Sequence, residues 1–431
     1  MHFLYSAALL LALLVTLPYW LWKMLAAGKY RSGLAERLGS VPPRILRRSP
    51  EGCIWVHAVS VGEVLAIGKL VEGLAARHPG RRLFVSTTTA TGQKLARERF
   101  GEENVFFFPL DLGFSVRSYM RALRPAMVVL AETEFWPNFL HAAHSQGARV
   151  AVVNARISDR SFPRYRWLRF VWRHVLRRVA VFLAQSGLDA QRLVEIGAPA
   201  ERVRVAGNLK FDIAAPAAKP VVEMLGAAFA RSGVDQVIVA GSTVEGEEPL
   251  LLDAFRPLLK SHPRTALVLA PRHPERFESV AGLLLGSSSS FIRRSRMTGQ
   301  ESCAGAVILL DTIGELAAVY TLASVAFVGG SLVPRGGHNI LEPAQHGVPI
   351  VTGPHTENFR DIVNIFSRAG AVSVAAPEWL SAELLRLLDD SVVRRELGQR
   401  AADVFRSQSG ATARTLEALE TLLPAVESRA G

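Results

Sequence analysis

A glycine-rich segment carries the strongest chemical signal in this chain. It runs from Gly329 to Ala344 as GGSLVPRGGHNILEPA, with Asn339 and Glu342 at spacing i, i+3. Backbone amides and the helix dipole at a helix N-terminus favour anions. The segment therefore predicts a phosphate site, with Glu342 placed to accept hydrogen bonds from ribose hydroxyls. It matches neither G-x-G-x-x-G nor a Walker loop, which argues against NAD and ATP chemistry.

Glu63 stands in the turn after an apolar run, CIWVHAV. Together with Ser60 it forms Ser-x-x-Glu, the pattern of a capping box in which the glutamate bonds back to the N-cap amide. Gly62, however, would let a substrate approach the backbone, and ligands of α/β folds bind at the carboxyl ends of strands. The residues leave two interpretations open: a helix cap, or a carboxylate that acts as general base.

Three other strand ends carry charged side chains. Glu132 and Glu134 follow the run MVVL, where an acidic pair can hold a sugar hydroxyl or orient a neighbouring base; the alternative is a solvated loop. Lys210 ends the last β-like run of the first half, at a position suited to an anionic donor. Arg272 follows the run ALVLA and can clamp a phosphate or carboxylate with two hydrogen bonds, or can lie exposed at a helix start.

Short apolar runs alternate with helical stretches along most of the chain, which predicts parallel sheets covered on both faces. One series runs from CIWVHAV to RVRVAGN and another from QVIVAGS to VSVAA. Between them, residues 213–220 (IAAPAAKP) have the composition of a linker. We predict an α/β fold of two Rossmann-like, doubly wound domains, residues 24–212 and 221–431, with a ligand cleft between them. A helical stretch from about Ser381 can pack back across the linker.

The N-terminal residues predict a membrane anchor, assigned to residues 1–23. From Phe3 to Leu21 no side chain is charged, and aromatic residues at 19, 20 and 22 are followed by Lys23, Lys29 and Arg31. This length suffices to cross a hydrocarbon core, and the trailing positive charge places the body of the protein in the cytoplasm. A buried apolar helix is the alternative.

The net charge of +12, from 50 Lys and Arg against 38 Asp and Glu, calls for an anionic partner. Anionic lipid and nucleic acid both satisfy this charge, but no zinc-finger spacing or RNA-binding aromatic motif is present, so no nucleic-acid partner is expected. The two cysteines, Cys53 and Cys303, form no disulfide framework and suit a reducing compartment. No metal-ligand spacing stands out.

A basic stretch from Arg164 to Val179 predicts one amphipathic helix. Arginines recur at positions 169, 173 and 177. The apolar stripe consists of Leu168, Val171, Trp172, Val175, Leu176 and Val179. Such a helix can lie in an anionic membrane surface. The alternative is a helix that packs on the core and exposes its arginines to solvent.

Seven segments together resemble the Kdo transferase family (3-deoxy-D-manno-octulosonic acid transferases). They are WVHAVSVGE, ETEFWPN, NARISDRS, GNLKFD, PRHPERF, GELAAVY and GGSLVPRGGHNILEPA, in the family's order and across nearly the whole chain. The resemblance implies a GT-B fold, CMP-Kdo as donor and the lipid A precursor (lipid IVA) as acceptor. It also implies an inverting transfer without metal or cofactor, at the cytoplasmic face of the bacterial inner membrane in lipopolysaccharide synthesis.

The same resemblance assigns roles to individual residues. Glu63 matches the general base, and Glu132 and Lys210 match positions that stabilise the transition state. The residues that match contacts to the cytidine nucleotide are Pro271, Arg272, Ile313, Gly314, Glu315, Asn339, Ile340, Leu341 and Glu342. Other members often carry Met and Pro where this chain has Ile313 and Ile340; both positions are expected to present backbone to the ligand.

Two other functions fit parts of the sequence. A transferase or epimerase that uses UDP-sugars would account for the two sheets and the glycine-rich segment. A non-catalytic protein that binds anionic lipid or nucleic acid would account for the charge, but not for the polar residues at the predicted strand ends.

Overall fold

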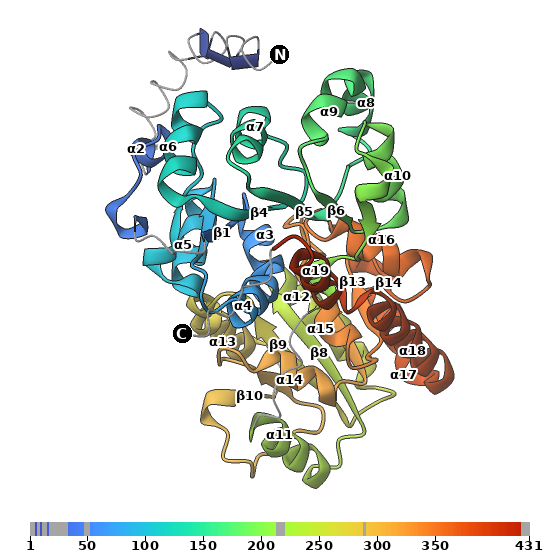
Figure 1. Ribbon diagram of the computed structural model, residues 1–431. Helices are drawn as coiled ribbons and strands as arrows, with labels where there is room; N and C mark the ends of the chain where they lie inside the picture. Colours follow the sequence, from blue (N-terminus) through green and yellow to red (C-terminus); the bar gives the residue numbers. More distant parts are fainter. Residues whose placement is uncertain are drawn as a thin grey trace, which may run out of the picture. The chain divides into compact units, whose positions relative to one another are not determined.

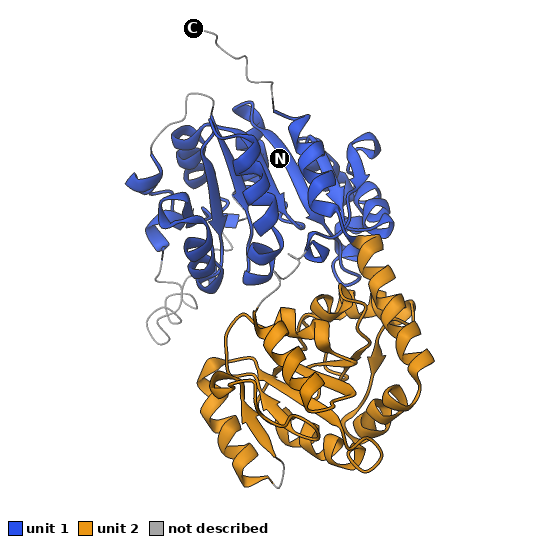
Figure 2. Cartoon of the chain, turned by 90° about the horizontal axis from the view of Figure 1, so that it is seen from below, with its two compact units in different colours: residues 1–212, 409–431 blue, residues 213–408 orange. Residues whose placement is uncertain are grey.

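The computed structural model describes residues 5–6, 9–10, 15–16, 33–46, 52–212, 220–287 and 290–423. The chain forms two compact units, one of residues 1–212 and 409–431, the other of residues 213–408 (Figure 2). The predicted linker lies almost wholly outside the described residues. Unit 2 ends at Gln408 rather than at residue 431, because the last helix belongs to unit 1.

Unit 1 contains a parallel sheet of seven strands in the order β3-β2-β1-β4-β5-β6-β7 (Figure 1). The strands are β1 (Cys53–His57), β2 (Leu83–Thr87), β3 (Val105–Phe107), β4 (Pro125–Ala131), β5 (Arg149–Ala155), β6 (Val181–Ala184) and β7 (Val203–Val205). Strand β1 is buried at every position. This is the pattern of a strand covered by helices on both faces.

Alternate residues of the strands point into two separate cores, as the pleat requires. Trp55 belongs to one core, with side chains of α6, α7, α9 and α10; Ile54 and Val56 belong to the other, with α3, α4, α5 and α19. The helices of unit 1 are α2 (Leu34–Arg37), α3 (Val61–Ala66), α4 (Gly68–Arg77), α5 (Ala90–Phe100), α6 (Gly113–Leu123), α7 (Pro137–Ser145), α8 (Phe162–Trp167), α9 (Arg169–Leu176), α10 (Gly187–Glu195) and α19 (Ala411–Glu420).

A carboxylate fastens the returning C-terminal helix to unit 1. Asp212, the last residue of the first segment, accepts a hydrogen bond of 2.6 Å from the Gly410 amide and another from the Thr412 amide, at the start of α19. A negative charge is favourable at this end of a helix. Leu416 and Leu419 of α19 then join the core on the α4 face.

Unit 2 repeats the architecture, with seven parallel strands in the order β10-β11-β9-β8-β12-β13-β14. The strands are β8 (Gln236–Thr243), β9 (Thr265–Pro271), β10 (Phe291–Arg293), β11 (Val307–Leu309), β12 (Val325–Val328), β13 (Ile350–Thr352) and β14 (Ser373–Val374). The helices are α11 (Pro220–Arg231), α12 (Glu247–Leu258), α13 (Phe277–Gly286), α14 (Leu316–Val319), α15 (Leu341–Ala344), α16 (Arg360–Arg368), α17 (Leu380–Asp389) and α18 (Ser391–Gln408). The prediction of two doubly wound α/β sheets is therefore confirmed.

Two predicted helices, the N-terminal anchor and the basic helix from 164 to 179, are not confirmed. The predicted anchor, residues 1–23, lies mostly outside the described residues, and no helix in the described part of the chain is long and apolar enough to cross a membrane. The predicted single helix from 164 to 179 is wrong, because the chain breaks at Leu168 into α8 and α9. Val175, Leu176 and Val179 pack into the core of unit 1, so the predicted apolar stripe is largely core and does not face lipid.

Candidate active site

Glu63 lies in the first turn of α3 and is 9% exposed. Its Oε2 accepts a hydrogen bond of 2.8 Å from the Val59 amide, and its Oε1 accepts one of 2.9 Å from the Ser60 hydroxyl. A capping box would use the Ser60 amide and a return bond from the Ser60 hydroxyl to the helix; the Ser60 side chain makes no such bond. The turn therefore orients the Glu63 carboxylate and leaves lone pairs on both oxygens for a further partner.

Glu132 follows β4 directly and has an unusual backbone conformation. Its φ is +57°, a left-handed value that residues other than glycine seldom adopt. The Glu132 amide donates to the Val153 carbonyl of the neighbouring strand β5 at 2.9 Å, which holds the residue in this conformation. Strain of this kind concentrates at functional sites. Its effect here is to set the carboxylate at the carboxyl edge of the sheet.

Lys210 lies in a short 3-10 turn, Leu209–Phe211, and its Nζ is 3.6 Å from Oε1 of Glu132. Two asparagines hold this turn: Asn208 Oδ1 accepts from the Lys210 amide, and Asn154 Oδ1 accepts from the Leu209 amide, each at 3.0 Å. Neither asparagine stands out in the sequence by residue type or spacing. Both occur in segments that carry the family resemblance, NARISDRS and GNLKFD. Their place in these segments is the sequence signal that could have identified them as site residues.

The carboxylates of Glu63, Glu132 and Glu134 form one electrostatic cluster, because β1 and β4 are adjacent strands with their carboxyl ends at the same edge. Burial raises the pKa of Glu63, and the Glu132 charge raises it further. Hydrogen bonds from the Val59 amide and the Ser60 hydroxyl, and the charge of Lys210, lower it by less, so the net shift is upward. Burial, followed by the Glu63 charge, raises the pKa of Glu134 to about 7. A carboxyl group whose pKa is about 7, as for Glu134, can accept a proton near neutral pH.

In unit 2, the predicted nucleotide residues fall into two groups at strand ends. Arg272 directly follows Pro271, the last residue of β9. Burial raises the pKa of Glu342 in α15, and the charge of Arg272 partly opposes this rise. Burial, followed by the charges of Arg272 and His273, lowers the pKa of His338 to about 4. Arg272, His338 and Glu342 therefore lie together, with a cation and a neutral imidazole that can donate to an anion.

The second group is the loop that follows β11. Ile313 is 79% exposed and Gly314 has a positive φ of 79°. Glu315 forms an ion pair of 3.0 Å with Arg294 and accepts a hydrogen bond from the Thr312 hydroxyl. This loop can present backbone groups and an apolar side chain to a ligand, while Glu315 is held by its own neighbours.

Part of the glycine-rich segment differs from the phosphate site that the sequence predicted. The amides of Gly330, Ser331 and Leu332 donate to the carboxylate of Glu247, at 2.7, 2.8 and 2.9 Å, so they are not available to a phosphate. Glu247 begins α12 and is fully buried. Glu247 is not among the predicted site residues; its local signal in the sequence is an acidic pair at a helix start, in STVEGEEP.

The other end of this segment remains open to a ligand. Ile340 and Leu341 are buried, so the expected contact of the Ile340 backbone with a ligand stays a prediction. Asn339 Oδ1 accepts from the Leu341 amide at 3.1 Å, and the helix that follows, α15, spans only four residues. Glu342 in its first turn, beside Arg272, is the carboxylate that can take ribose hydroxyls.

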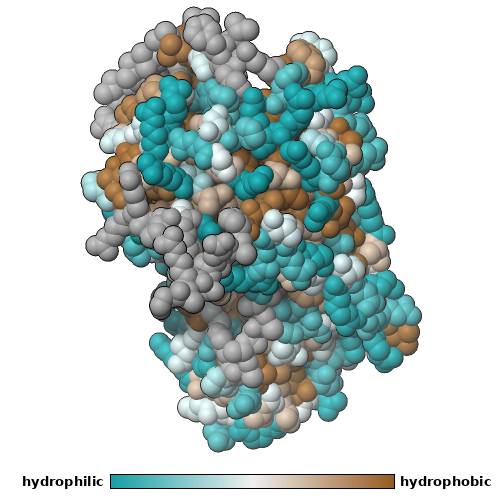
Figure 3. All heavy atoms as spheres, in the orientation of Figure 1, coloured by the Kyte–Doolittle hydropathy of each residue, from teal (hydrophilic) through white to brown (hydrophobic). Residues whose placement is uncertain are grey.

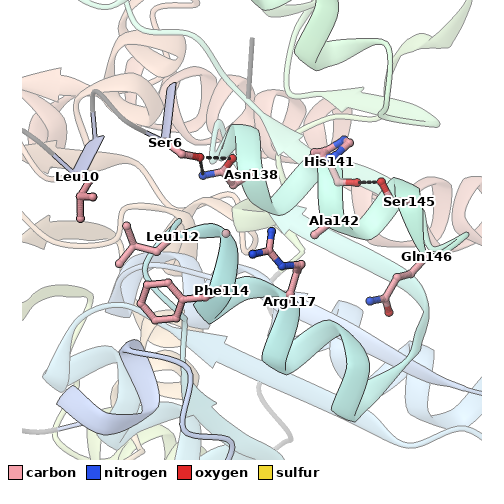
Figure 4. Close-up of a pocket in the computed structure, with 11 residues that line it drawn as sticks. Ser6, Leu10, Leu112, Phe114, Arg117, Asn138, His141, Ala142, Ser145 and Gln146 are labelled. Carbon is pink, nitrogen blue, oxygen red and sulfur yellow. Dashed lines mark hydrogen bonds between the residues drawn. The ribbon is translucent and has the colours of Figure 1, made fainter. Parts of the chain in front are cut away.

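A cavity of about 530 Å³ also opens in unit 1, between α6 and α7 (Figure 4). Apolar side chains such as Leu112 and Phe114 line it, and Arg117 extends into the space between the helices. None of the predicted site residues lines this cavity. Among the residues that the structure describes, no group of three or more His, Cys, Asp or Glu side chains can hold a metal ion.

The fold and the site together define a class of enzyme. Two doubly wound units, each with charged and polar side chains at the carboxyl ends of its strands, are the architecture of a GT-B glycosyltransferase. Solved structures with this fold include a glycosyltransferase from Rickettsia africae (TM-score 0.51, 12% identity, 87% of this chain and 100% of that one) and UDP-GlcNAc 2-epimerase from Neisseria meningitidis (TM-score 0.53, 14% identity, 85% and 99%). These likenesses show the fold alone.

The family follows from sequence similarity. Residues 32–213 match the family model described as 3-deoxy-D-manno-octulosonic-acid transferase (kdotransferase). The chain is 36% identical to the 3-deoxy-D-manno-octulosonic acid transferase of Bordetella pertussis over 94% of this chain and 95% of that one. It is 34% identical to that of Haemophilus influenzae over 92% of each. The chain belongs to the Kdo transferase family and is a glycosyltransferase.

Proposed function

We propose that this protein transfers Kdo from CMP-Kdo to a lipid A precursor, lipid IVA, in lipopolysaccharide synthesis. The cluster of Glu63, Glu132, Glu134 and Lys210 is the observation that carries this proposal. It supplies a buried carboxylate with a raised pKa, oriented by the turn before α3, and a cation in contact with a second carboxylate. A transfer to a hydroxyl needs a group that accepts the hydroxyl proton and charges that stabilise the leaving group.

The proposed reaction is a single displacement. Glu63 accepts the proton of an acceptor hydroxyl while the hydroxyl oxygen attacks the anomeric carbon of Kdo. The bond to the CMP phosphate breaks, and the phosphate leaves with the bonding electron pair. One displacement inverts the anomeric centre. Lys210, held by Glu132, stabilises negative charge as the bonds change, and no metal or cofactor takes part.

The donor nucleotide is assigned to unit 2. Arg272 there lies near a half-buried carboxylate, Glu342, and a neutral histidine, His338. The guanidinium suits the CMP phosphate, and the carboxylate suits the ribose hydroxyls. We place the enzyme at the cytoplasmic face of the bacterial inner membrane, with the apolar run from Phe3 to Leu21 as its anchor. The net charge of +12 suits a donor and an acceptor that are both anionic.

The test is transfer of Kdo from CMP-Kdo to lipid IVA, with products measured by mass spectrometry. Glu63→Gln should lower kcat by about 100-fold or more, the usual contribution of a general base. Ser60→Ala is the matched control: it removes one hydrogen bond to Glu63 but keeps the base, so most activity should remain. A fully active, folded Glu63→Gln variant would leave Glu63 as a structural residue of the turn.

Two further arms separate this proposal from its alternatives. CMP should raise the Tm of the protein and UDP should not; the reverse result would favour a UDP-sugar enzyme. Treatment with a chelator followed by dialysis should leave the transfer rate unchanged. If the rate is lost and a divalent cation restores it, the reaction is not metal-independent.

A further inference from the structure

The loop after β11, residues 312–315, begins between two other strand ends of unit 2. Strand β11 lies between β10 and β9 in the parallel sheet. The turn after β10, residues 294–296, leaves the sheet on one side of the loop, and Arg272 follows β9 on the other. The carboxyl ends of parallel strands meet at one edge, where ligands of α/β folds bind. The turn after β10 is therefore placed to act on the loop that carries three of the predicted nucleotide residues.

Asp311 fixes the start of this loop. Its Oδ1 accepts a hydrogen bond of 2.7 Å from the Ser295 amide, and its Oδ2 accepts one of 2.6 Å from the Ser295 hydroxyl and one of 2.7 Å from Nε of Arg293. Burial raises the pKa of Asp311, but the hydrogen bonds from Ser295 and Arg293 outweigh burial and hold it below its ordinary value. A buried charge whose hydrogen bonds are complete keeps its neighbours in one arrangement.

Arg294 fixes the other end of the loop. Its Nη2 donates to Oε1 of Glu315 at 3.0 Å, and both side chains are largely buried, at 17% and 19% exposed. The Thr312 hydroxyl donates to the other oxygen of the same carboxylate. Ile313 and Gly314, between these contacts, are exposed. The loop is therefore tied at both ends, while its middle faces solvent.

The exposed Ile313 is not by itself evidence of a ligand site. Hydrophilic and apolar atoms are mixed over the face of unit 2 that Figure 3 shows, and single exposed apolar residues are normal on a protein surface. The charged groups that hold the loop are more informative. Buried ion pairs contribute little net stability, so their main effect here is to restrict the backbone of the loop to one conformation.

We infer that Arg294 is a positioning residue that keeps this loop in the conformation that recognises the nucleobase. A fixed backbone presents its amides and carbonyls in one order. Cytosine donates from its amino group and accepts at the adjacent ring nitrogen, whereas uracil has the reverse pattern at the same two positions. A loop that cannot rearrange satisfies one base and leaves polar groups unpaired with the other. The inference rests on the proposed function only for which base is preferred, cytosine.

A different role for Arg294, as a positive charge that attracts any nucleotide, predicts another result. The phosphate is common to CMP and UMP, so loss of an attractive charge would weaken both nucleotides equally. Loss of a positioning contact would instead weaken the preferred nucleotide and spare the other. The ratio of the two affinities therefore separates the two roles.

The experiment measures binding of CMP and of UMP to the full-length chain by isothermal titration. Wild type should bind CMP roughly 10- to 100-fold more tightly than UMP, the discrimination that a pair of hydrogen bonds to a base edge provides. Arg294→Met should weaken CMP about 10-fold and change UMP little. Arg296→Met, an exposed arginine of the same turn, removes an equal charge and should keep the wild-type ratio. Arg294→Lys keeps a cation beside Glu315 and should restore part of the preference.

Kinetics and a second variant separate positioning from folding. In the transfer assay, Arg294→Met should raise KM for CMP-Kdo by about the same factor as the Kd for CMP, and kcat should not change. Thr312→Val removes the other hydrogen bond to Glu315 and should shift the ratio of affinities in the same direction. This variant provides the test if Arg294→Met does not fold, which its Tm would show.

Two results would overturn the inference: an unchanged ratio of CMP to UMP affinity in a folded Arg294→Met variant, or equal binding of CMP and UMP by wild type. A wild-type preference for UMP that narrows in Arg294→Met would contradict the proposed donor and support the positioning role. A wild-type protein that binds neither nucleotide would contradict both proposals.

Discussion

The Nζ atom of Lys210 lies 3.6 Å from Oε1 of Glu132, although the two residues are far apart in sequence. The pair joins the end of β4 to the turn after β7, and the neighbouring strand holds Glu132 in a left-handed conformation. Its position beside Glu63 makes it the best place to test whether the cluster acts as one unit.

Lys210→Met should lower kcat by roughly 100- to 1,000-fold, because a positioned charge near the reacting centre contributes on that scale. Binding of CMP, measured by calorimetry, should not change. Glu132→Gln should also lower kcat, and the double variant should lose less than the product of the two single losses, since each residue acts through the other. Lys94→Met, at an exposed site on α5, is the control. Fully additive losses would show that the two residues act separately.

Glu134 should make the stability of the protein depend on pH. Burial and the Glu63 charge raise its pKa from 4.5 to about 7, so the folded protein binds this proton more tightly than the unfolded chain does. The free energy of unfolding should therefore fall as pH rises from about 4.5 to about 7. In the Glu134→Gln variant the free energy of unfolding should fall less over this pH range, by roughly 1–3 kcal/mol.

Urea unfolding at a series of pH values measures this effect. Glu63 titrates in both proteins, so the difference between variant and wild type measures Glu134 together with its coupling to Glu63. An unchanged pH dependence would mean that Glu134 ionises normally in the folded protein.

Glu247 should be required for the shape of the glycine-rich segment. Its buried carboxylate accepts amide hydrogen bonds from Val244, Gly330, Ser331 and Leu332. Glu247→Ala leaves these buried donors unpaired and should cost about 3–5 kcal/mol of stability. Glu245→Gln, an exposed neighbour, should change the Tm little. If the Tm of Glu247→Ala equals that of wild type, the shape of the glycine-rich segment does not depend on the Glu247 carboxylate.

Arg272 should bind the phosphate of the nucleotide. Arg272→Met should weaken CMP binding by about 10- to 100-fold, the range for hydrogen bonds to charged groups. Arg272→Lys keeps the charge but loses the two-pronged geometry, and should fall between Met and wild type. Isothermal titration with CMP and with cytidine separates the roles, because cytidine carries no phosphate and its affinity should hardly change. Arg296→Met is the exposed control. Equal losses for CMP and cytidine would place Arg272 away from the phosphate.

The sequence by itself determined the repeating α/β architecture and the strand ends where charged residues stand. Uninterrupted apolar runs have one stable arrangement, a parallel sheet covered by helices, and such sheets gather their carboxyl ends at one edge. This is why Glu63, Glu132 and Lys210, chosen one by one from turns after apolar runs, lie in one cluster. The family resemblance added the roles, which the geometry allows and the experiments above test.

Tertiary structure alone decided which side chains face solvent and which amides remain free. The period of the stretch from 164 to 179 was helical, but the break at Leu168 put its stripe in the core and left Trp167 and Phe170 exposed. The amides of the glycine-rich segment belong to Glu247, and the last helix belongs to unit 1 through Asp212. Each outcome depends on contacts between residues distant in sequence, and local periodicity and propensity contain no information about such contacts.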